Sequence, residues 1–280
     1  MYGISQVLSN SLTLFTRYRI KVRIVKESSS LAVCCHDRET AGFFDTGGPD
    51  DDLFEKLPDS IIDKLKWVAL SHGHLDHTGG LMDLGRKKSP YEIDLYLHPK
   101  TLAGKFSKDK YGLRANGLQA TEQELLKAGF RPHYSRKPIE IVPGVFFLGE
   151  IPRLTDFEKV HDRFVDQNGF HDTMPDDTAL MIDRPEGAVV LLGCSHCGAV
   201  NTVRYALQNS VSKKISWIIG GCHLYEAGEE QIEKTIEAFR FFQGANISLN
   251  HCTGEEARKK IKSIFKSRYV ELPENSEIEV

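Results

Sequence analysis

Four side chains that can bind a metal ion lie within six consecutive positions of this sequence. They follow the pattern His-x-His-x-Asp-His, at His72, His74, Asp76 and His77. Imidazole and carboxylate groups are ligands of zinc, manganese and ferrous iron, and a turn can direct alternate side chains toward two adjacent ions. Asp76 and His77 would hold one ion, and the two preceding histidines the other. A surface loop whose side chains bind only water is the alternative, but it does not explain so dense a cluster.

The residues around this cluster indicate how it is held. The apolar run at 67–70 predicts a buried strand that ends where the cluster begins. Gly73 and the pair Gly79-Gly80 favour a loop over a helix. Asp76 could orient an attacking water molecule as well as bind metal, so it is the candidate catalytic residue.

Three further histidines follow apolar runs in the second half of the chain. They are His196, His223 and His251. Ligands gather beyond the strand ends of open sheets, so these side chains could converge on one cleft and complete the metal sites. For each histidine taken singly, a hydrogen-bonded position at a turn is the alternative.

Four of the six cysteines lie within two residues of these histidines: Cys194, Cys197, Cys222 and Cys252. The spacing Cys194-x-x-Cys197 suits a shared metal, a redox pair or part of an iron–sulfur site. We favour the alternative that these small side chains pack at strand ends beneath the site. Neighbours in sequence often point to opposite sides of a strand, which favours packing for some of them.

Composition sets the broad class of the protein. A chain of 280 residues with 40% hydrophobic and 27% charged residues is typical of a soluble globular protein with a large core. The net charge of −3 gives no general surface for polyanions, so nucleic acid is not expected as a partner. No apolar run approaches the ~20 residues of a membrane helix, and residues 1–14 lack a signal-peptide pattern. Six cysteines do not indicate a secreted disulfide scaffold, and we expect a cytoplasmic protein.

Two segments could contact a substrate. Residues 150–177 are charged and aperiodic, which is typical of a lid or substrate-recognition loop, and Arg153 and His171 are its candidate substrate-binding residues. Residues 100–116 are basic, and we expect a solvated loop and short helix there. The alternative for this second segment is a rim that attracts phosphate-bearing substrates.

Local patterns predict several helices and strands. A helix is expected to start at residues 49–52, with apolar spacing at Leu53, Leu57, Ile61 and Leu65. Thr121 and Glu124 form a capping-box pattern before a second helix. Strands and helices alternate in the C-terminal half. The acidic tail after Tyr269 is expected to fray or to pack on a neighbouring subunit, and a homodimer stays open.

The His-x-His-x-Asp-His segment resembles the metal-binding motif of the metallo-β-lactamase superfamily. Residues 43–48, Phe-Phe-Asp-Thr-Gly-Gly, are similar to that family's first motif, in which Asp45 would support the metal loop rather than bind the ion. The resemblance covers roughly residues 20–255. It implies an α/β fold, the four-layer αββα sandwich of two mixed sheets with outer helices, and a single domain over residues 1–280.

Three later segments resemble one branch of the superfamily. Residues 193–198, 220–224 and 251–254 are similar to the dihydropterin-type synthases of methanopterin biosynthesis and their bacterial relatives. The lactamase and glyoxalase pattern is not kept in full. No lone histidine sits cleanly before residue 178, His171 being the nearest, and Cys194 with His196 stands where a bridging aspartate would be expected. One or two ions are therefore possible.

The resemblance implies a metal-dependent enzyme acting on a small phosphorylated or pterin-like molecule. We expect a hydrolase first, since two ions roughly 3.5–4 Å apart can generate hydroxide at neutral pH and bind a phosphate oxygen. The alternative is the branch's synthase reaction, which joins a dihydropterin diphosphate to an aminobenzene ribosyl phosphate and releases diphosphate. A non-catalytic metal or redox sensor also stays open. The expected cofactor is one or two divalent ions, zinc ahead of iron or manganese, with an iron–sulfur cluster disfavoured.

Overall fold

Six strands from the first half of the chain and one from its C-terminal end form a mixed seven-stranded sheet in the computed structural model, which describes residues 19–53, 55–88 and 92–280. Its strands are β1 (Lys21–Lys26), β2 (Ala32–His36), β3 (Ala41–Phe44), β4 (Leu65–Ala69), β5 (Ile93–Leu97), β8 (Phe130–Tyr134) and β16 (Glu277–Glu279). They lie in the order β16-β1-β2-β3-β4-β5-β8. Strands β3, β4, β5 and β8 run parallel, so all four end at one edge of the sheet.

The second half of the chain supplies a six-stranded sheet. Its strands are β9 (Ile139–Val142), β10 (Val145–Phe147), β12 (Ala179–Ile182), β13 (Ala188–Leu192), β14 (Ile215–Gly220) and β15 (Asn246–Leu249). They lie in the order β15-β14-β13-β12-β10-β9, and β13, β14 and β15 run parallel. The carboxyl ends of these three strands therefore meet at one edge, where parallel strands commonly place ligand-binding side chains.

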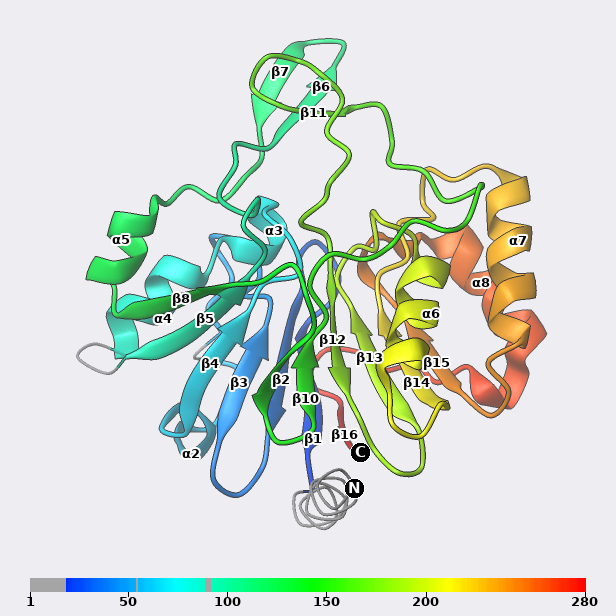
Figure 1. Cartoon of the computed structure of the whole chain (residues 1–280), viewed down its shortest axis with the longest axis horizontal. Helices are drawn as coiled ribbons and strands as arrows, with labels where there is room; N and C mark the ends of the chain where they lie inside the picture. Colours follow the sequence, from blue (N-terminus) through cyan, green and yellow to red (C-terminus); the bar gives the residue numbers. More distant parts are fainter. Residues whose placement is uncertain (1–18, 54, 89–91) are drawn as a thin grey trace, which may run out of the picture.

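The two sheets pack face to face, and helices cover their outer faces (Figure 1). Helices α2 (Asp59–Ile62), α4 (Leu81–Lys88) and α5 (Glu122–Lys127) bury apolar side chains on the first sheet. Helices α6 (Ala199–Asn209), α7 (Glu229–Arg240) and α8 (Glu255–Phe265) do so on the second. Strand β13 shows how the layers form: Ala188, Val190 and Leu192 face the helices, while Val189 and Leu191 face the other sheet. The αββα prediction is confirmed.

The basic segment at 100–116 forms a hairpin instead of the expected solvated loop and short helix. Strands β6 (Phe106–Asp109) and β7 (Gly112–Ala115) pair antiparallel around a two-residue turn, and Gly112 has a φ of 115°. Glycine adopts that backbone angle without the clash that a Cβ would cause. Strand β11 (Phe164–Val165), from the aperiodic segment, adds to β6. This small sheet lies at the end of the molecule where the short helix α3 (Leu75–Thr78) is found (Figure 1).

The helix predicted from residue 49 is wrong in extent. Helix α2 contains only Asp59–Ile62, and Leu65 already begins strand β4. Pro58 directly precedes α2, with a ψ of 143°. Proline has no N–H to donate and disfavours the helical conformation of the residue before it, so a helix can begin after Pro58 but cannot run through it. The capping box at Thr121 is confirmed: its backbone N donates to Glu124 Oε2 at 2.8 Å.

The acidic tail neither frays nor needs a neighbouring subunit, which corrects the expectation from sequence. Strand β16 pairs antiparallel with β1, and Lys21 Nζ lies 2.8 Å from Glu277 Oε1. Opposite charges on adjacent strands favour this pairing. The N-terminal residues 1–14, in which no signal peptide was expected, lie outside the described residues. Within the part of the chain that the structure describes, no helix has the length and apolar character needed to cross a membrane.

A glycine on β3 gives a direct test of the sheet packing. Gly42 pairs with Trp67 of β4, and a Cβ at Gly42 would lie 2.0 Å from two ring carbons of the tryptophan. Because that ring is buried, Gly42→Ala should lower the free energy of unfolding by about 1–3 kcal/mol or more, measured by urea denaturation. The matched control is Gly228→Ala, which has open space around it and should lose less than about 1 kcal/mol. Equal unfolding midpoints for the two variants would contradict the packing described here.

Candidate metal centre

Loops that follow four strand ends bring the predicted ligands together at one edge of the sandwich. The segment after β4 carries the His-x-His-x-Asp-His cluster, and the segments after β13, β14 and β15 carry His196, His223 and His251. All of these segments lie at the α3 end of the two sheets (Figure 1). The parallel direction of the strands in each sheet is what makes the loops meet.

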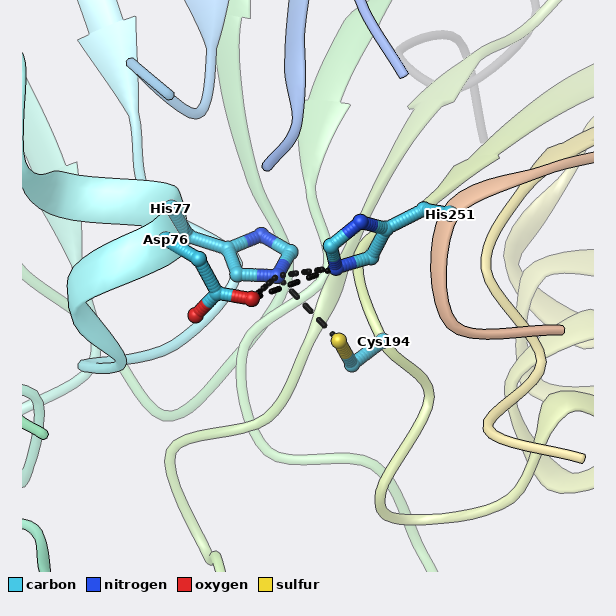
Figure 2. A group of neighbouring side chains, drawn as sticks. All are labelled: Asp76, His77, Cys194 and His251. Carbon is cyan, nitrogen blue, oxygen red and sulfur yellow. Dashed lines mark hydrogen bonds and ion pairs between the residues drawn. The ribbon is translucent and has the colours of Figure 1, made fainter. Parts of the chain in front are cut away.

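The first group of possible ligands contains Asp76, His77, Cys194 and His251 (Figure 2). His77 Nε2 lies 3.1 Å from both Cys194 Sγ and His251 Nε2. Asp76 Oδ2 lies 3.4 Å from His251 Nε2 and 3.7 Å from His77 Nε2. Around a tetrahedral zinc, with bonds of about 2.0–2.3 Å, ligand atoms are about 3.3–3.8 Å apart. Two of these four distances lie within that range and two are about 0.2 Å shorter, so small side-chain shifts would let the group hold one such ion.

The second group contains His72, Cys194 and His196. His74 lies beside it: its Nδ1 is 2.9 Å from His72 Nε2, and its ring centroid is 5.0 Å from that of His196. Cys194 belongs to both groups, so its sulfur stands where a shared ligand would lie. The two groups thus contain three of the four cluster residues and two of the three later histidines, while the predicted ligand His74 lies outside both.

The chemistry of the buried nitrogens supports a metal ion in the second group. His196 Nε2, in this group, and His74 Nε2, beside it, are buried and have no hydrogen-bond partner among the described residues. Burial lowers the pKa of His74 to about 3 and holds the pKa of His72 and His196 well below the usual range. At neutral pH these rings are neutral, so each keeps a lone pair to give to a cation.

Asp45 lies directly behind the first group. Its Oδ2 is 2.7 Å from His77 Nδ1, and its Oδ1 accepts a 2.7 Å hydrogen bond from the backbone N of Ser71. A carboxylate in this position holds the proton on Nδ1 and directs the Nε2 lone pair toward the ion. Burial opposes protonation of His77, but the carboxylates of Asp45 and Asp76 outweigh it and raise the pKa of this histidine. These contacts are the ones that a supporting role for Asp45 requires.

His251 is oriented by the other end of the chain. Its Nδ1 lies 3.1 Å from the backbone carbonyl O of Ser28, in the turn between β1 and β2, and can donate a hydrogen bond to it. Its backbone N donates to the carbonyl O of Glu27 at 2.8 Å. The Nε2 atom therefore faces the first group, and the turn at 27–30 is part of what positions it.

Several predicted site residues lie outside both groups. His223 lines an open cavity beside the two groups, with its ring centroid 4.4 Å from that of His196, but it is in neither group. Cys197 Sγ contacts Thr202 Oγ1 at 3.2 Å, and Cys222 packs in the apolar core under the helices. Cys194 is the one cysteine in each group, which is too few for an iron–sulfur cluster of four thiolates. Cys252 lines the cavity beside Cys194.

The two predicted substrate-binding residues do not line the cavity that contains the histidines. The Arg153 guanidinium donates to the carbonyl oxygens of Met174, at 2.8 Å, and His196, at 3.3 Å. It therefore ties the aperiodic segment to the loop after β13. His171 lines a separate cavity of about 450 Å³ beside Asp172.

A buried ion-pair network behind the metal loop was not anticipated from the sequence. Lys105 Nζ lies 2.9 Å from Asp172 Oδ2 and 2.5 Å from Asp176 Oδ1, and the other Asp176 oxygen accepts a 2.9 Å hydrogen bond from the backbone N of Gly73. Burial would lower the pKa of Lys105, but the two carboxylates outweigh it and raise the pKa. The basic segment and the aperiodic segment thus both hold the loop between His72 and His74. The Asp176-Asp177 pair just before β12 was the available sequence signal.

Comparisons with known proteins identify the family of this chain. The sequence profile of the metallo-beta-lactamase superfamily matches residues 44–198. The chain is 33% identical over 215 residues to the 7,8-dihydropterin-6-methyl-4-(beta-D-ribofuranosyl)-aminobenzene-5'-phosphate synthase of Methanocaldococcus jannaschii, covering 73% of this chain and 72% of that protein. An uncharacterised protein of the same organism is 29% identical over 201 residues, covering 71% of this chain and 73% of that protein.

A solved structure agrees over nearly the whole chain. Tm1679, described as a metal-dependent hydrolase of the β-lactamase superfamily, superposes with a TM-score of 0.75 at 26% identity, covering 93% of this chain and 99% of Tm1679. The chain belongs to the metallo-β-lactamase superfamily. Within it, the chain falls in the branch that includes the M. jannaschii synthase, as the motifs predicted.

The contact between Asp45 and His77 yields a test of metal retention. Asp45→Asn removes the charge that holds the Nδ1 proton, so zinc affinity should fall about 10–100-fold while the protein stays folded. Zinc affinity is measured by competition with a chromophoric chelator, and folding by circular dichroism. The control is Asp59→Asn, an exposed position in α2 at the opposite end of the sandwich (Figure 1), which should bind zinc as the wild type does. Unchanged affinity in Asp45→Asn would show that this carboxylate does not support the site.

The shared position of Cys194 yields a second test. If one sulfur serves both groups, Cys194→Ser should lower the metal content from about two equivalents per chain to about one or fewer. The measurement is elemental analysis after anaerobic purification, which also identifies the metal. Cys197→Ser is the matched control, because that thiol contacts Thr202 and should not alter metal content. Loss of metal in the control but not in Cys194→Ser would reverse the assignment.

Proposed function

We propose that this protein is a metal-dependent hydrolase of a small phosphorylated substrate. The observation that carries the proposal is a pair of ligand groups sharing Cys194, beside an open cavity of about 780 Å³. That volume suits a small organic molecule. Imidazole, thiolate and carboxylate together suit zinc or ferrous iron better than manganese, which prefers oxygen ligands. Two such ions, when bound, supply hydroxide at neutral pH and stabilise charge on a phosphate oxygen.

Asp76 is the residue of the chain proposed to handle the proton. Its side chain is 42% exposed and lines the cavity, while its Oδ2 faces His77 and His251. Burial would raise the pKa of Asp76, but the two histidines outweigh it and hold the pKa below the usual range. The carboxylate is therefore ionised at neutral pH and can accept a hydrogen bond from the attacking water, orienting it toward the substrate.

The β6–β7 hairpin supplies positive charge for a phosphate group. Lys108 and Arg114 line the cavity, and neither has an ion-pair partner among the residues that the structure describes. Arg163 also lines it, but its guanidinium lies 2.8 Å from Glu226. Unpaired lysine and arginine side chains beside a metal site attract phosphate oxygens, so they support the proposed substrate class. This is the rim that the sequence offered as the alternative for residues 100–116.

A synthase reaction is the second candidate, supported by the M. jannaschii relative and its name. That reaction would need room for an aromatic ring system beside the metal groups. Phe164 and Tyr225 line the cavity, and the Phe164 ring centroid is 4.8 Å from that of His196. An aromatic wall can pack against a planar substrate. A metal held by the same ligand groups would then bind diphosphate oxygens of the leaving group.

The two reactions differ in their products, which gives the test. Zinc-loaded protein is incubated with 4-nitrophenyl phosphate and its diester, and separately with a dihydropterin diphosphate plus an aminobenzene ribosyl phosphate. Release of nitrophenol supports the hydrolase, and release of diphosphate with a joined product supports the synthase. Asp76→Asn should lower kcat about 10²–10⁴-fold. If neither mixture turns over with fully loaded protein, the proposal fails and a binding protein is indicated.

The proposed phosphate-binding residues of the β6–β7 hairpin should affect KM in the same assay. Because Lys108 and Arg114 would contact the phosphate rather than the reacting water, replacing both with Ala should raise KM more than it lowers kcat. The matched control is Lys110→Ala, on the turn of the same hairpin but outside the cavity lining, which should leave KM near that of the wild type. An unchanged KM in the double variant would remove these residues from substrate binding.

A further inference from the structure

Two cysteine side chains meet across a glycine at the edge of the second sheet. Cys194 follows β13 and Cys252 follows β15, and these strands lie on either side of β14, which ends just before Gly221. A Cβ at Gly221 would lie 2.6 Å from Cys252 Sγ and 3.5 Å from the Cα of Cys194. Gly221 has no side chain to fill that space, so Cys252 can extend over the end of β14 toward Cys194.

The Cys252 thiol contacts Cys194 directly. Its Sγ donates a hydrogen bond to the Cys194 carbonyl O at 3.5 Å. The His223 backbone N donates to Cys252 Sγ at 3.3 Å, which fixes the position of this sulfur. Both cysteines line the open cavity, so a small oxidant can reach them. Cys252 is partly exposed, whereas the other five cysteines are buried: Cys34, Cys35, Cys194, Cys197 and Cys222.

We propose that Cys194 and Cys252 are a redox modification site, forming a reversible disulfide when the protein meets a peroxide. The pairing itself follows from the contact of the Cys252 sulfur with the Cys194 backbone and from the space at Gly221 that both cysteines border. Its consequence for metal binding rests on the proposed metal centre, since Cys194 is the residue common to both ligand groups. A sulfur bonded to another sulfur no longer binds a metal as a thiolate does, so one bond would weaken both groups together.

The reaction balances with hydrogen peroxide as the oxidant. The more exposed thiol, Cys252, attacks one peroxide oxygen, giving a sulfenic acid and one water. The Cys194 sulfur then attacks the Cys252 sulfur, the S–O bond breaks, and the oxygen leaves as a second water. The two cysteines lose two electrons and two protons, and peroxide accepts both. A small dithiol reverses the change by thiol–disulfide exchange.

The pairing is tested in metal-free protein, where it does not depend on the proposed function. After mild peroxide treatment, the wild type should fall from six free thiols to four and yield one linked peptide pair containing residues 194 and 252, both changes reversed by dithiothreitol. Cys197→Ser should form the same link, and Cys252→Ser should not. No link in the wild type, or a link from Cys252 to Cys222, overturns the inference. Since the decisive result is in the wild type, a misfolded variant would not obscure it.

The consequence for metal binding is tested in zinc-loaded protein. Zinc release to a chromophoric chelator should follow disulfide formation in the wild type and be at least about tenfold slower in Cys252→Ser. Disulfide formation without zinc release overturns the coupling. Failure of the wild type to bind zinc before peroxide is added overturns the metal centre, while the mapped disulfide still stands.

Discussion

The rest of the site depends on the buried carboxylate of Asp45. Its side chain is fully buried, and a charge in that position is tolerated only if hydrogen bonds surround it. The backbone N and the hydroxyl of Ser71 supply two, and the His77 ring supplies a third. The Asp45 carboxylate thus fixes the start of the metal loop, the orientation of the candidate ligand His77 and the turn after β3. Removing any one of these three hydrogen bonds would leave the buried charge of Asp45 less well compensated.

The metal loop is also held by segments that approach from outside the two large sheets. Leu75 N donates to the Asn116 carbonyl O at 2.7 Å, and Leu118 N donates to the Gly73 carbonyl O at 2.8 Å, so the chain leaving the β6–β7 hairpin is bonded directly to the loop. Asp176 bonds the same loop from the other side. Hydrogen bonds therefore connect the hairpin that carries the proposed phosphate-binding side chains to the loop that carries the candidate metal ligands.

Cys194 gives the site a character that a bridging carboxylate would not. A thiolate is a soft ligand, so it favours zinc or ferrous iron over harder ions. It can also be oxidised, which a carboxylate cannot. Cys252 Sγ contacts the Cys194 carbonyl O, so the proposed disulfide would involve the one residue shared by the two ligand groups. Metal binding and redox state would then depend on the same sulfur atom.

The sequence by itself determined two features that depend on near neighbours, the strand before the metal loop and the Asp45 turn. The αββα class came from the resemblance of its motifs to a known family. It misjudged the helix from residue 49, although Pro58 was visible. Only the tertiary structure decided that Cys194 lies in both groups while Cys197 and His223 lie in neither. The reason is backbone geometry at the strand ends. Ser195, His223 and His251 have φ angles of 58°, 46° and 48°, which redirect the side chains around them. Such angles are uncommon for these residue types and are stabilised by contacts between residues far apart in the sequence. The contact of His251 with Ser28 is one of these, and it cannot be predicted from the residues next to either position.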